Sequence, residues 1–253
     1  MKKYGFIDAH CHLVHDAYTR PQDYVEKAKE AGLTAALVTT GMKADHAGVL
    51  KLCAANKGFL FAVIGVSPYD AVSMSKEELE THLSYIEKHK RDIVGIGEIG
   101  LDFHHFTKKE DFQAQERVFR AQLELAKQLD LPVVMHTRKA EREAFEIFKE
   151  YKISGMLHCF FLHEVAVEAI KTPGVLVSLP TLKNKDRDRI IRDVPLDRLV
   201  CETDSPYLWP SFPSEPSNVI EVYERIASKK QVALDEVKRQ VFQNVNSFFK
   251  LQL

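Results

Sequence analysis

The sequence has little of several features that define other protein classes. Four cysteines occur among 253 residues and none forms a CxxC pair, which excludes a small disulfide scaffold and predicts reduced, buried thiols. Lysine and arginine total 35 against 36 aspartates and glutamates, so the net charge of -1 excludes a large basic face that could coat duplex DNA. No apolar run approaches the length of a membrane span, and Asp8, His10 and His12 interrupt the run that a signal peptide needs. We therefore expect a cytoplasmic protein with no membrane partner.

Short β-branched runs that alternate with amphipathic helical stretches are present along most of the chain. Hydrophobic residues make up 45% of the 253, enough for one full core, and we expect a single domain over residues 1–253. The expected strands are 4–8, 34–39, 60–66, 93–97, 133–136, 155–158, 175–179 and 198–202. Eight such alternations predict an α/β fold with a parallel sheet, which right-handed crossovers close into a (β/α)8 TIM barrel. An open, doubly wound sheet is the alternative, since periodicity does not show closure.

Helix starts and the C-terminal tail add detail to this barrel. Ser75 with Glu78 and Thr107 with Glu110 both fit the S/T-x-x-E capping box, and a helix is expected over 108–130. Residues 219–253 predict two extra helices with no strand after them. The proline-rich stretch 206–216 is interpreted as a loop at the barrel rim.

Six potential metal ligands fall at or just past the ends of five expected strands. They are His10, His12, Glu98, His136, His158 and Asp204. The carboxyl ends of barrel strands meet at one rim, so residues far apart in the chain reach one site. Side chains alternate along a strand, so both histidines of the first pair leave the same face and can reach one ion, whereas Cys11 points away. This pattern predicts a hydrolase with two metal ions.

The remaining donors strengthen this interpretation. Glu98 lies between Gly97 and Ile99-Gly100, where no bulky neighbour shields its carboxylate from a cation. Asp204, after the eighth strand, could both bind metal and exchange a proton with the attacking water, whereas Glu202 is expected to support the site through a salt bridge. Imidazole and carboxylate donors suit two divalent ions such as zinc or manganese, and magnesium less well.

The segments around these residues resemble the motif series of a known enzyme family. The segments are Asp8-Ala9-His10-Cys11-His12-Leu13, Gly97-Glu98-Ile99-Gly100-Leu101-Asp102, Pro132-Val133-Val134-Met135-His136-Thr137-Arg138, His158-Cys159-Phe160 and Glu202-Thr203-Asp204-Ser205-Pro206-Tyr207-Leu208. In order and spacing they are similar to the TatD family of metal-dependent deoxyribonucleases. The resemblance implies an amidohydrolase-type TIM barrel in which one ion is held by His10, His12 and Asp204, the other by His136 and His158, and both by Glu98. It also implies phosphodiester hydrolysis, often as an exonuclease on DNA ends or single strands.

Three departures from the family pattern fall where substrate would lie. The family's G-x-H-P-H segment reads Gly65-Val66-Ser67-Pro68-Tyr69 here, Phe161-Leu162 replaces a Ser-Gly pair, and an arginine is missing between residues 211 and 217. Substrate contacts are therefore less defined than the metal positions. The alternative is an ester or amide hydrolase on the same scaffold, such as an aminoacyl-tRNA deacylase or a lactonase. A third hypothesis, an inactive binding protein, is disfavoured by the complete ligand set.

Two residues are candidates for substrate binding. Arg138 lies two positions after His136, so it could face the same pocket and hold a phosphate oxygen, although a solvated arginine is nearly as good an interpretation. Tyr69 could stack on a base, as aromatic side chains do in sites for single strands. The sequence leaves the oligomeric state, the metal and the cleavage polarity open.

Overall fold

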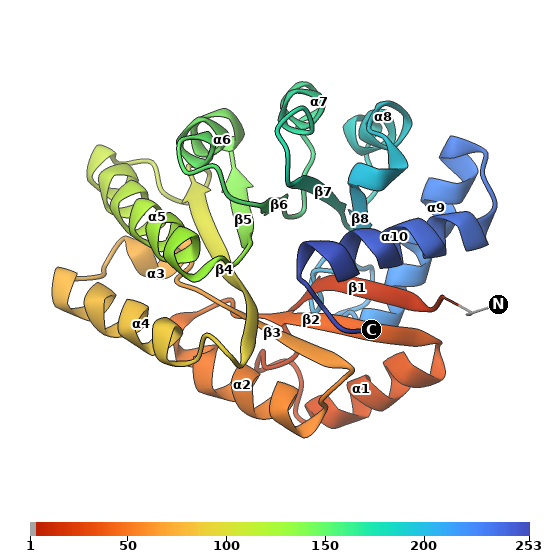
Figure 1. Ribbon diagram of the computed structural model, residues 1–253, viewed down its shortest axis with the longest axis horizontal. Coiled ribbons are helices and arrows are strands. Elements are labelled where there is room, and N and C mark those ends of the chain that lie inside the picture. Colours follow the sequence, from red (N-terminus) through yellow and green to blue (C-terminus); the bar gives the residue numbers. More distant parts are fainter. Residues whose placement is uncertain (1–3) are drawn as a thin grey trace.

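Eight parallel strands ring the centre of the molecule in a computed structural model that describes residues 4–253 (Figure 1). The strands are β1 (Phe6–Cys11), β2 (Leu33–Thr39), β3 (Leu60–Ile64), β4 (Ile93–Asp102), β5 (Val133–Arg138), β6 (Gly155–Leu157), β7 (Val175–Leu179) and β8 (Leu199–Cys201). Each strand pairs in parallel with the next, from β1 through β8. The arrangement confirms the predicted (β/α)8 barrel over the open sheet.

The barrel closes along a seam between β1 and the chain that follows β8. The N–H of Asp204 donates to the carbonyl of His10 at 3.0 Å, and the N–H of His12 donates to the carbonyl of Ser205 at 2.7 Å. A parallel bridge pairs Cys11 with Ser205 at the same level. The seam is therefore made at the carboxyl end of the strands, by residues from the predicted metal site.

Strand composition explains why this sheet is buried on both faces. All residues of β7 are buried, and β2 has one partly exposed residue, Thr34, among its seven. Parallel sheets covered by helices on the outside and packed side chains on the inside have such continuous apolar strands. The core of the described residues is correspondingly dominated by one large cluster that includes side chains from every strand, with a second, small cluster around Val66, Met74 and Val118.

Helices cover the outside of the barrel (Figure 1). They are α1 (Pro21–Glu30), α2 (His46–Ala55), α3 (Pro68–Ala71), α4 (Lys76–Lys88), α5 (Lys109–Leu129), α6 (Glu141–Lys149), α7 (His163–Ala169), α8 (Lys185–Asp193), α9 (Ile220–Lys230) and α10 (Leu234–Phe248), with short 3-10 turns at Lys43–Asp45, Leu196–Arg198 and Pro216–Val219. No helix within residues 4–253 has both the length and the low charge needed to cross a membrane.

The two predicted C-terminal helices are present and support the strands of the seam. The Tyr223 hydroxyl of α9 accepts from the N–H of Ile7 at 2.9 Å and donates to the carbonyl of Ile7 at 3.0 Å. The side-chain amide of Asn244 in α10 donates to the carbonyl of Leu199 at 2.8 Å. The two extra helices therefore supply hydrogen-bond partners for backbone groups of β1 and β8.

One of the two predicted capping boxes was wrong. Ser75 caps α4, with reciprocal hydrogen bonds to Glu78 of 3.1 and 3.0 Å. In α5, however, the N-cap is Lys108, whose backbone is extended and whose side chain makes no capping bond. The helix therefore begins at Lys109, one residue too late for the hydroxyl of Thr107 to act as the cap.

Three strands extend further than predicted. β1 continues to Cys11, β4 to Asp102 and β5 to Arg138, so that His10, Glu98 and His136 lie within strands rather than at their ends. The paired backbone continues because Gly100 and Asp102 stay in register with His136 and Arg138. The side chains of His10, Glu98 and His136, which suggested strand ends in the sequence, instead lie inside the barrel near its carboxyl end. His12, His158 and Asp204 do follow their strands, as predicted.

Candidate metal centre

The structure brings all six predicted ligand residues together at the carboxyl end of the barrel. They come from β1, β4 and β5 and from the segments that follow β1, β6 and β8. Four of the six side chains are almost fully buried, while 15% of the His136 side chain and 14% of the Asp204 side chain remain exposed. These two residues are therefore the members of the group that solvent or substrate can reach most directly.

His10, His12 and Asp204 form one cluster of donors. The Nε2 atoms of His10 and His12 lie 3.1 Å apart. Asp204 Oδ1 lies 3.6 Å from His10 Nε2 and 3.3 Å from His12 Nε2. Asp204 has a left-handed backbone (φ 56°), which aspartate tolerates better than most residues, and its N–H is held by the seam. The seam thus fixes the carboxylate beside the two imidazoles.

Glu98 lies between this cluster and a second pair of histidines. Its Oε2 atom is 3.8 Å from His10 Nε2 and 3.7 Å from His12 Nε2. Its other oxygen, Oε1, is 2.5 Å from His136 Nδ1 and 4.0 Å from His158 Nε2. One carboxylate therefore directs a separate oxygen at each histidine pair.

Local backbone features of β4 place this carboxylate. Gly97 pairs with Val134 and Ile99 with Met135, so Glu98 is an extra residue in β4 and forms a bulge. Bulges re-aim a side chain next to a site. Gly100, at φ 144°, follows in a close approach to β5, where a Cβ atom would collide with the carbonyl oxygen of His136. Glycine is thus required at position 100 by both conformation and space.

His136 and His158, the second pair, each have a further carboxylate beside one of their ring nitrogens, in addition to Glu98. His136 Nε2 hydrogen-bonds with Asp102 Oδ2 at 3.1 Å, and His158 Nδ1 lies at an ion-pair distance of 3.0 Å from Glu202 Oε1, without the geometry of a hydrogen bond. Such carboxylate contacts fix the ring orientation and the basicity of metal-binding histidines. Glu202 has the supporting position expected from the sequence. Asp102 was not assigned a role, although its even spacing from Glu98 along the strand would have indicated the same face.

These carboxylates keep the second histidine pair protonated when no metal competes. Burial lowers the pKa of His136, but Glu98 and Asp102 outweigh it and raise the pKa to about 9. Burial also opposes the charge on His158, yet the carboxylates around it, chiefly Glu202, raise its pKa to about 10. For Glu98 itself, burial raises the pKa, but the neighbouring histidines, chiefly His136, bring it down to about 2. The metal-free second side is therefore a buried network of ion pairs.

The first histidine pair has no such carboxylate support. His12 Nδ1 hydrogen-bonds with the backbone carbonyl of Thr39 at 3.0 Å, and His10 Nδ1 has no hydrogen-bond partner in residues 4–253. Burial, together with the neighbouring histidines, holds the pKa of His10 well below its ordinary value. Burial also lowers the pKa of His12, but Asp204 and Glu98 outweigh it and raise the pKa overall. His10 is thus a neutral imidazole, the form that binds metal.

The donor set suits a divalent metal. Among the described residues, two groups made of predicted ligands have ligand atoms that all lie within 4.8 Å of one another: His10, His12 and Asp204, and His10, Glu98 and His158. His136 belongs to neither group, and its contact with the others is through Glu98. Mixed imidazole nitrogen and carboxylate oxygen donors favour zinc, manganese and related ions. Buried carboxylates and imidazoles that converge in this way are costly unless charges compensate one another, and a bound cation supplies that compensation.

A third group of potential ligands, His158, Cys159 and Glu202, is less suited to metal. Cys159 Sγ lies 3.4 Å from Arg187 Nη2, and the N–H of Cys159 donates to Glu202 Oε1 at 2.7 Å. Burial holds the pKa of the Cys159 thiol well above its ordinary value, which disfavours the thiolate that binds metal. Cysteine therefore remains outside the centre, and Cys11, whose Sγ lies 3.3 Å from the Leu37 carbonyl, points away as predicted.

The predicted substrate contacts lie on the His136 side of the centre. The Tyr69 hydroxyl lies 2.8 Å from His105 Nδ1, and its ring centroid lies 6.2 Å from that of His136. Arg138, at the end of β5, is exposed and makes no ion pair within residues 4–253, and its charge lowers the pKa of His104 on the same surface. Lys183, which follows β7 at the same end of the barrel, is paired with Glu221 at 3.0 Å.

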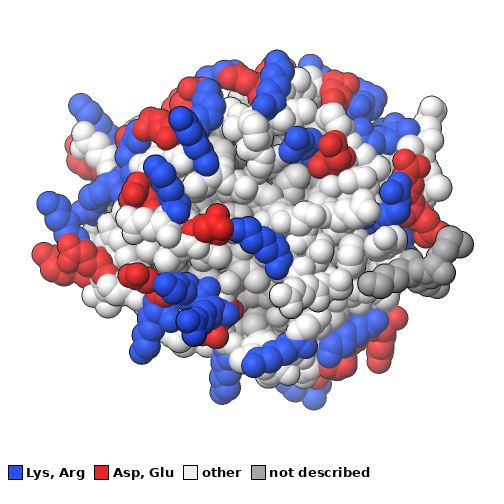
Figure 2. All heavy atoms as spheres, in the orientation of Figure 1, with Lys and Arg blue, Asp and Glu red and all other residues white. Residues whose placement is uncertain are grey.

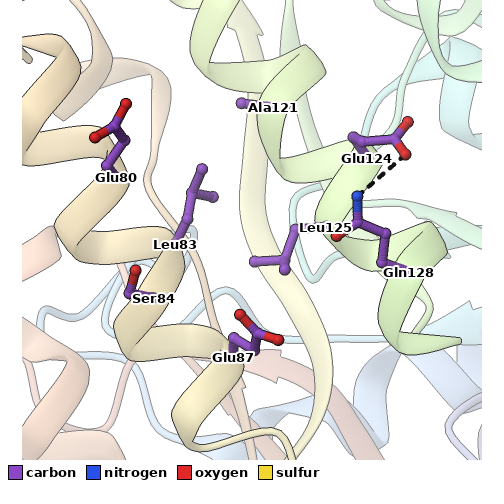
Figure 3. A pocket seen from close by; sticks show the side chains of 8 residues that line it. All are labelled: Glu80, Leu83, Ser84, Glu87, Ala121, Glu124, Leu125 and Gln128. Atoms are coloured by element: carbon purple, nitrogen blue, oxygen red, sulfur yellow. Dashed lines mark hydrogen bonds between the residues drawn. The ribbon is translucent and has the colours of Figure 1, made fainter.

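A separate surface groove of about 520 Å³ lies between α4 and α5 (Figure 3). Its lining residues are Glu80, Leu83, Ser84, Glu87, Ala121, Glu124, Leu125 and Gln128. The side chains that Figure 3 shows include no imidazole or thiol and no cation, and the Gln128 amide already donates to Glu124 at 3.3 Å. This groove therefore lacks the donors that converge at the barrel rim.

Comparison with known proteins agrees with this geometry. The family model described as TatD related DNase matches residues 7–250. An uncharacterized metal-dependent hydrolase of Methanocaldococcus jannaschii is 33% identical over 100% of both chains. Human deoxyribonuclease TATDN3 is 31% identical over 97% of this chain and 94% of its own, and the 3'-5' ssDNA/RNA exonuclease TatD of Pantoea vagans is 31% identical over 91% and 93%. The solved structure of the TatD homologue YjjV from Escherichia coli superposes with a TM-score of 0.88, at 25% identity over 97% of this chain and 98% of that one.

Proposed function

The chain belongs to the TatD related DNase family, and from this membership we propose that it is a metal-dependent deoxyribonuclease that hydrolyses phosphodiester bonds as an exonuclease. The observation that carries the proposal for this chain is the position of Glu98. Its two oxygens face two different histidine pairs, as a carboxylate shared between two metal ions requires. Two-metal sites are typical of nucleases and phosphatases.

We assign the ligands as the family resemblance implies. His10, His12 and Asp204 would hold one divalent ion, His136 and His158 would hold the other, and Glu98 would be a ligand shared by both. The ions are zinc, manganese or magnesium, of which the first two suit the imidazole donors better. When bound, such ions polarise the substrate and lower the pKa of a water towards neutrality.

The protein's own groups position the donors and move the proton. Asp204 is one of the two partly exposed members of the centre, so its carboxylate can take the proton of the attacking water and return it to the leaving group. Asp102 and Glu202 hold the rings of His136 and His158 in fixed orientations. General acid-base transfer of this kind contributes roughly 10² to 10⁴ to the rate.

The proposed substrate is single-stranded nucleic acid or a DNA end. Arg138 would hold a phosphate oxygen, and Tyr69 would contact the substrate beside His136. The face shown in Figure 2, which has α10 in front and does not show the metal centre, has acidic and basic side chains interspersed around a largely uncharged centre. With a net charge of -1, the protein is expected to engage few phosphates, which favours a chain end over a long duplex.

We also propose that residues 1–253 act as one domain in the cytoplasm. A single sheet that closes on itself accounts for the one-domain assignment. The four cysteines are free, and three of them are buried, as expected for a protein that functions in a reducing compartment.

Metal analysis of the purified protein, combined with a panel of substrates, tests the proposed function. The panel contains single-stranded DNA, duplex DNA with recessed and protruding ends, RNA, an aminoacyl ester and a lactone. We expect about two ions per chain and release of nucleotides from the ends of single strands. Hydrolysis of the ester or lactone without cleavage of any nucleic acid would contradict the proposal and favour the deacylase or lactonase.

A further inference from the structure

The large exposed apolar side chains of residues 4–253 gather at the mouth of the metal centre. They are Met42, Tyr69, Leu182, Tyr207 and Phe212. Each follows the carboxyl end of a strand: β2, β3, β7 or, for the last two, β8. Because the strands are parallel, these segments and the metal donors share one end of the barrel. Apolar exposure that is confined to one rim indicates a binding surface.

Aromatic rings form a continuous cluster on the His12 side of this rim. Tyr207 lies with its ring centroid 6.2 Å from that of His12, 5.4 Å from that of His15 and 6.4 Å from that of Phe212. Phe212 is 64% exposed and Tyr207 is 44% exposed. The cluster therefore extends from a proposed metal ligand outward into solvent. We call Tyr207, Phe212 and His15 the aromatic platform.

Hydrogen bonds hold the backbone of the platform in place. The N–H of Tyr207 donates to the carbonyl of Asp204 at 2.9 Å, and the N–H of Ser214 donates to that of Pro206 at 2.9 Å. The Tyr18 hydroxyl donates to the carbonyl of Ser214 at 2.6 Å, and the Thr181 hydroxyl to that of Leu208 at 2.7 Å.

The histidine of the platform is fixed as well. His15 Nδ1 accepts from the N–H of Ala17 at 3.0 Å, so Nε2 carries the proton of the neutral ring. The rings are therefore presented on an ordered loop, and little freedom is lost when a ligand binds.

We propose that the aromatic platform is a stacking site for a nucleobase of the strand whose phosphodiester lies at the metal centre. This inference rests on the proposed nuclease function. With 35 lysines and arginines against 36 aspartates and glutamates, the chain has no excess of positive charge to hold many phosphates, so affinity for single strands needs another source. Aromatic side chains provide it in a way that tolerates any sequence, since every base has a π face. The platform extends the contact surface to the His12 side, opposite the Tyr69 side of the centre.

The test removes the ring on the protein and the base on the substrate, separately and together. Metal-loaded wild-type protein, Phe212→Ala and Phe212→Leu are titrated with a fluorescent phosphorothioate-linked DNA strand and with the same strand carrying abasic residues. Leu182→Ala is the matched control, because it removes an exposed apolar side chain from the same rim without removing a ring. Phe212→Leu keeps apolar bulk, so a loss in both Phe212 variants reports the ring rather than misfolding.

The proposal gives a specific pattern of dissociation constants. Loss of a stacked ring weakens binding of the intact strand about 5- to 150-fold, whereas binding of the abasic strand is unchanged by the Phe212 substitutions. Leu182→Ala changes the constants for the intact strand and the abasic strand by the same factor, because Leu182 lies at the same rim but has no ring on which a base can stack. Equal losses for the two strands, or no loss for either, would overturn the stacking site.

Cleavage and oligomeric state, measured on the same variants, distinguish a failed stacking site from a failed nuclease function. If the wild type cleaves an ordinary strand while the Phe212 variants bind both probes normally, the nuclease function holds and the stacking site is wrong. If the wild type neither binds nor cleaves any strand, the proposed function itself fails and the platform proposal fails with it. A wild-type dimer that becomes monomeric in Phe212→Ala, by light scattering, would instead identify the platform as an interface between copies of the chain and overturn the proposal.

Discussion

The two sides of the metal centre differ in the groups that contact the imidazole rings of their histidines. On the His136 side, a carboxylate supports each ring: Asp102 for His136 and Glu202 for His158. On the His10 side, one ring contacts a backbone carbonyl and the other has no partner for its Nδ1 atom within residues 4–253. The same residue type therefore occurs in two electrostatic environments a few ångströms apart.

Because the two histidine pairs differ in carboxylate support, two ions that share Glu98 would not be bound with equal affinity. The carboxylates beside His136 and His158 keep these rings protonated, and a metal ion must displace those protons. Once the protons are gone, the same carboxylates increase the basicity of the rings. The neutral His10 needs no such exchange. We therefore expect the two ions to differ in affinity and in their dependence on pH, and substitutions on one side or on both should expose the difference.

Glu98→Gln is expected to have the largest effect because it removes the charge that both sides share. Most bound metal and most activity should disappear together, beyond the roughly 10- to 100-fold loss typical of an outer residue. Metal content by atomic emission and turnover on single-stranded DNA measure this. Cys11→Ala, in the same layer but pointing away, is the control and should change neither. Full activity of Glu98→Gln would eliminate the shared-ligand arrangement.

Asp204→Asn breaks the first side alone. The second ion should remain on His136 and His158, while turnover falls by at least roughly 10², the loss expected when a general acid-base group is removed. Single-turnover rates and the number of metal ions per chain give the two readouts. Near-normal turnover would assign proton transfer to another group.

Asp102→Asn weakens the support of the second side and should leave the first intact. Affinity for the ion on His136 is expected to fall about 10- to 100-fold. Competition with a fluorescent chelator measures this as a separate binding step. Asp92→Asn is a matched control, because Asp92 Oδ2 lies 3.0 Å from His89 Nδ1 in a histidine-carboxylate pair away from the centre. Equal losses at both ions would contradict the division into two sides.

The two sides should also differ in pH dependence. His136 and His158, with pKa values of about 9 and about 10, are protonated near neutral pH in the metal-free protein. Each proton that metal displaces makes affinity rise about tenfold per pH unit until the pH reaches that pKa. On the first side only His12, whose pKa is also raised, adds to this slope, because His10 is already neutral. Metal titrations by calorimetry between pH 6 and 8, in two buffers of different ionisation enthalpy, measure the protons released. Identical slopes of metal affinity against pH for the two ions would contradict the expected difference between the two sides of the centre.

Much of this molecule was predictable because its chemistry follows strand geometry. The spacing of His10 and His12 placed two rings on one face, and the alternation of strands and helices indicated the barrel that gathers Glu98, His136 and His158. The structure brings these residues together around Glu98, which lies within 4.0 Å of a ring nitrogen of each histidine. The two-residue period of side chains along a strand, and the position of each donor relative to its strand, were sufficient to predict this group because each donor lies on or beside a strand.

Other features depend on tertiary contacts that a sequence pattern does not contain. The bulge at Glu98 exists only because β4 and β5 lose register there. Asp102 gained its role when β4 extended beyond the expected end, and the predicted cap at Thr107 failed because the helix begins after Lys108. The aromatic platform was not identified because its rings lie in loops that have no periodicity.

The seam between β1 and β8 has a consequence for how the chain is made. The Asp8 carboxylate, 195 positions before Thr203 in the sequence, accepts hydrogen bonds from the N–H and hydroxyl of that residue. Contacts between such distant segments form late in folding, since a very long loop must close first. Asp204 also emerges from the ribosome long after His10. An unfinished polypeptide that ends before Asp204 therefore carries an incomplete set of the predicted ligands, and the metal centre can assemble only after β8 has been made and the barrel has closed.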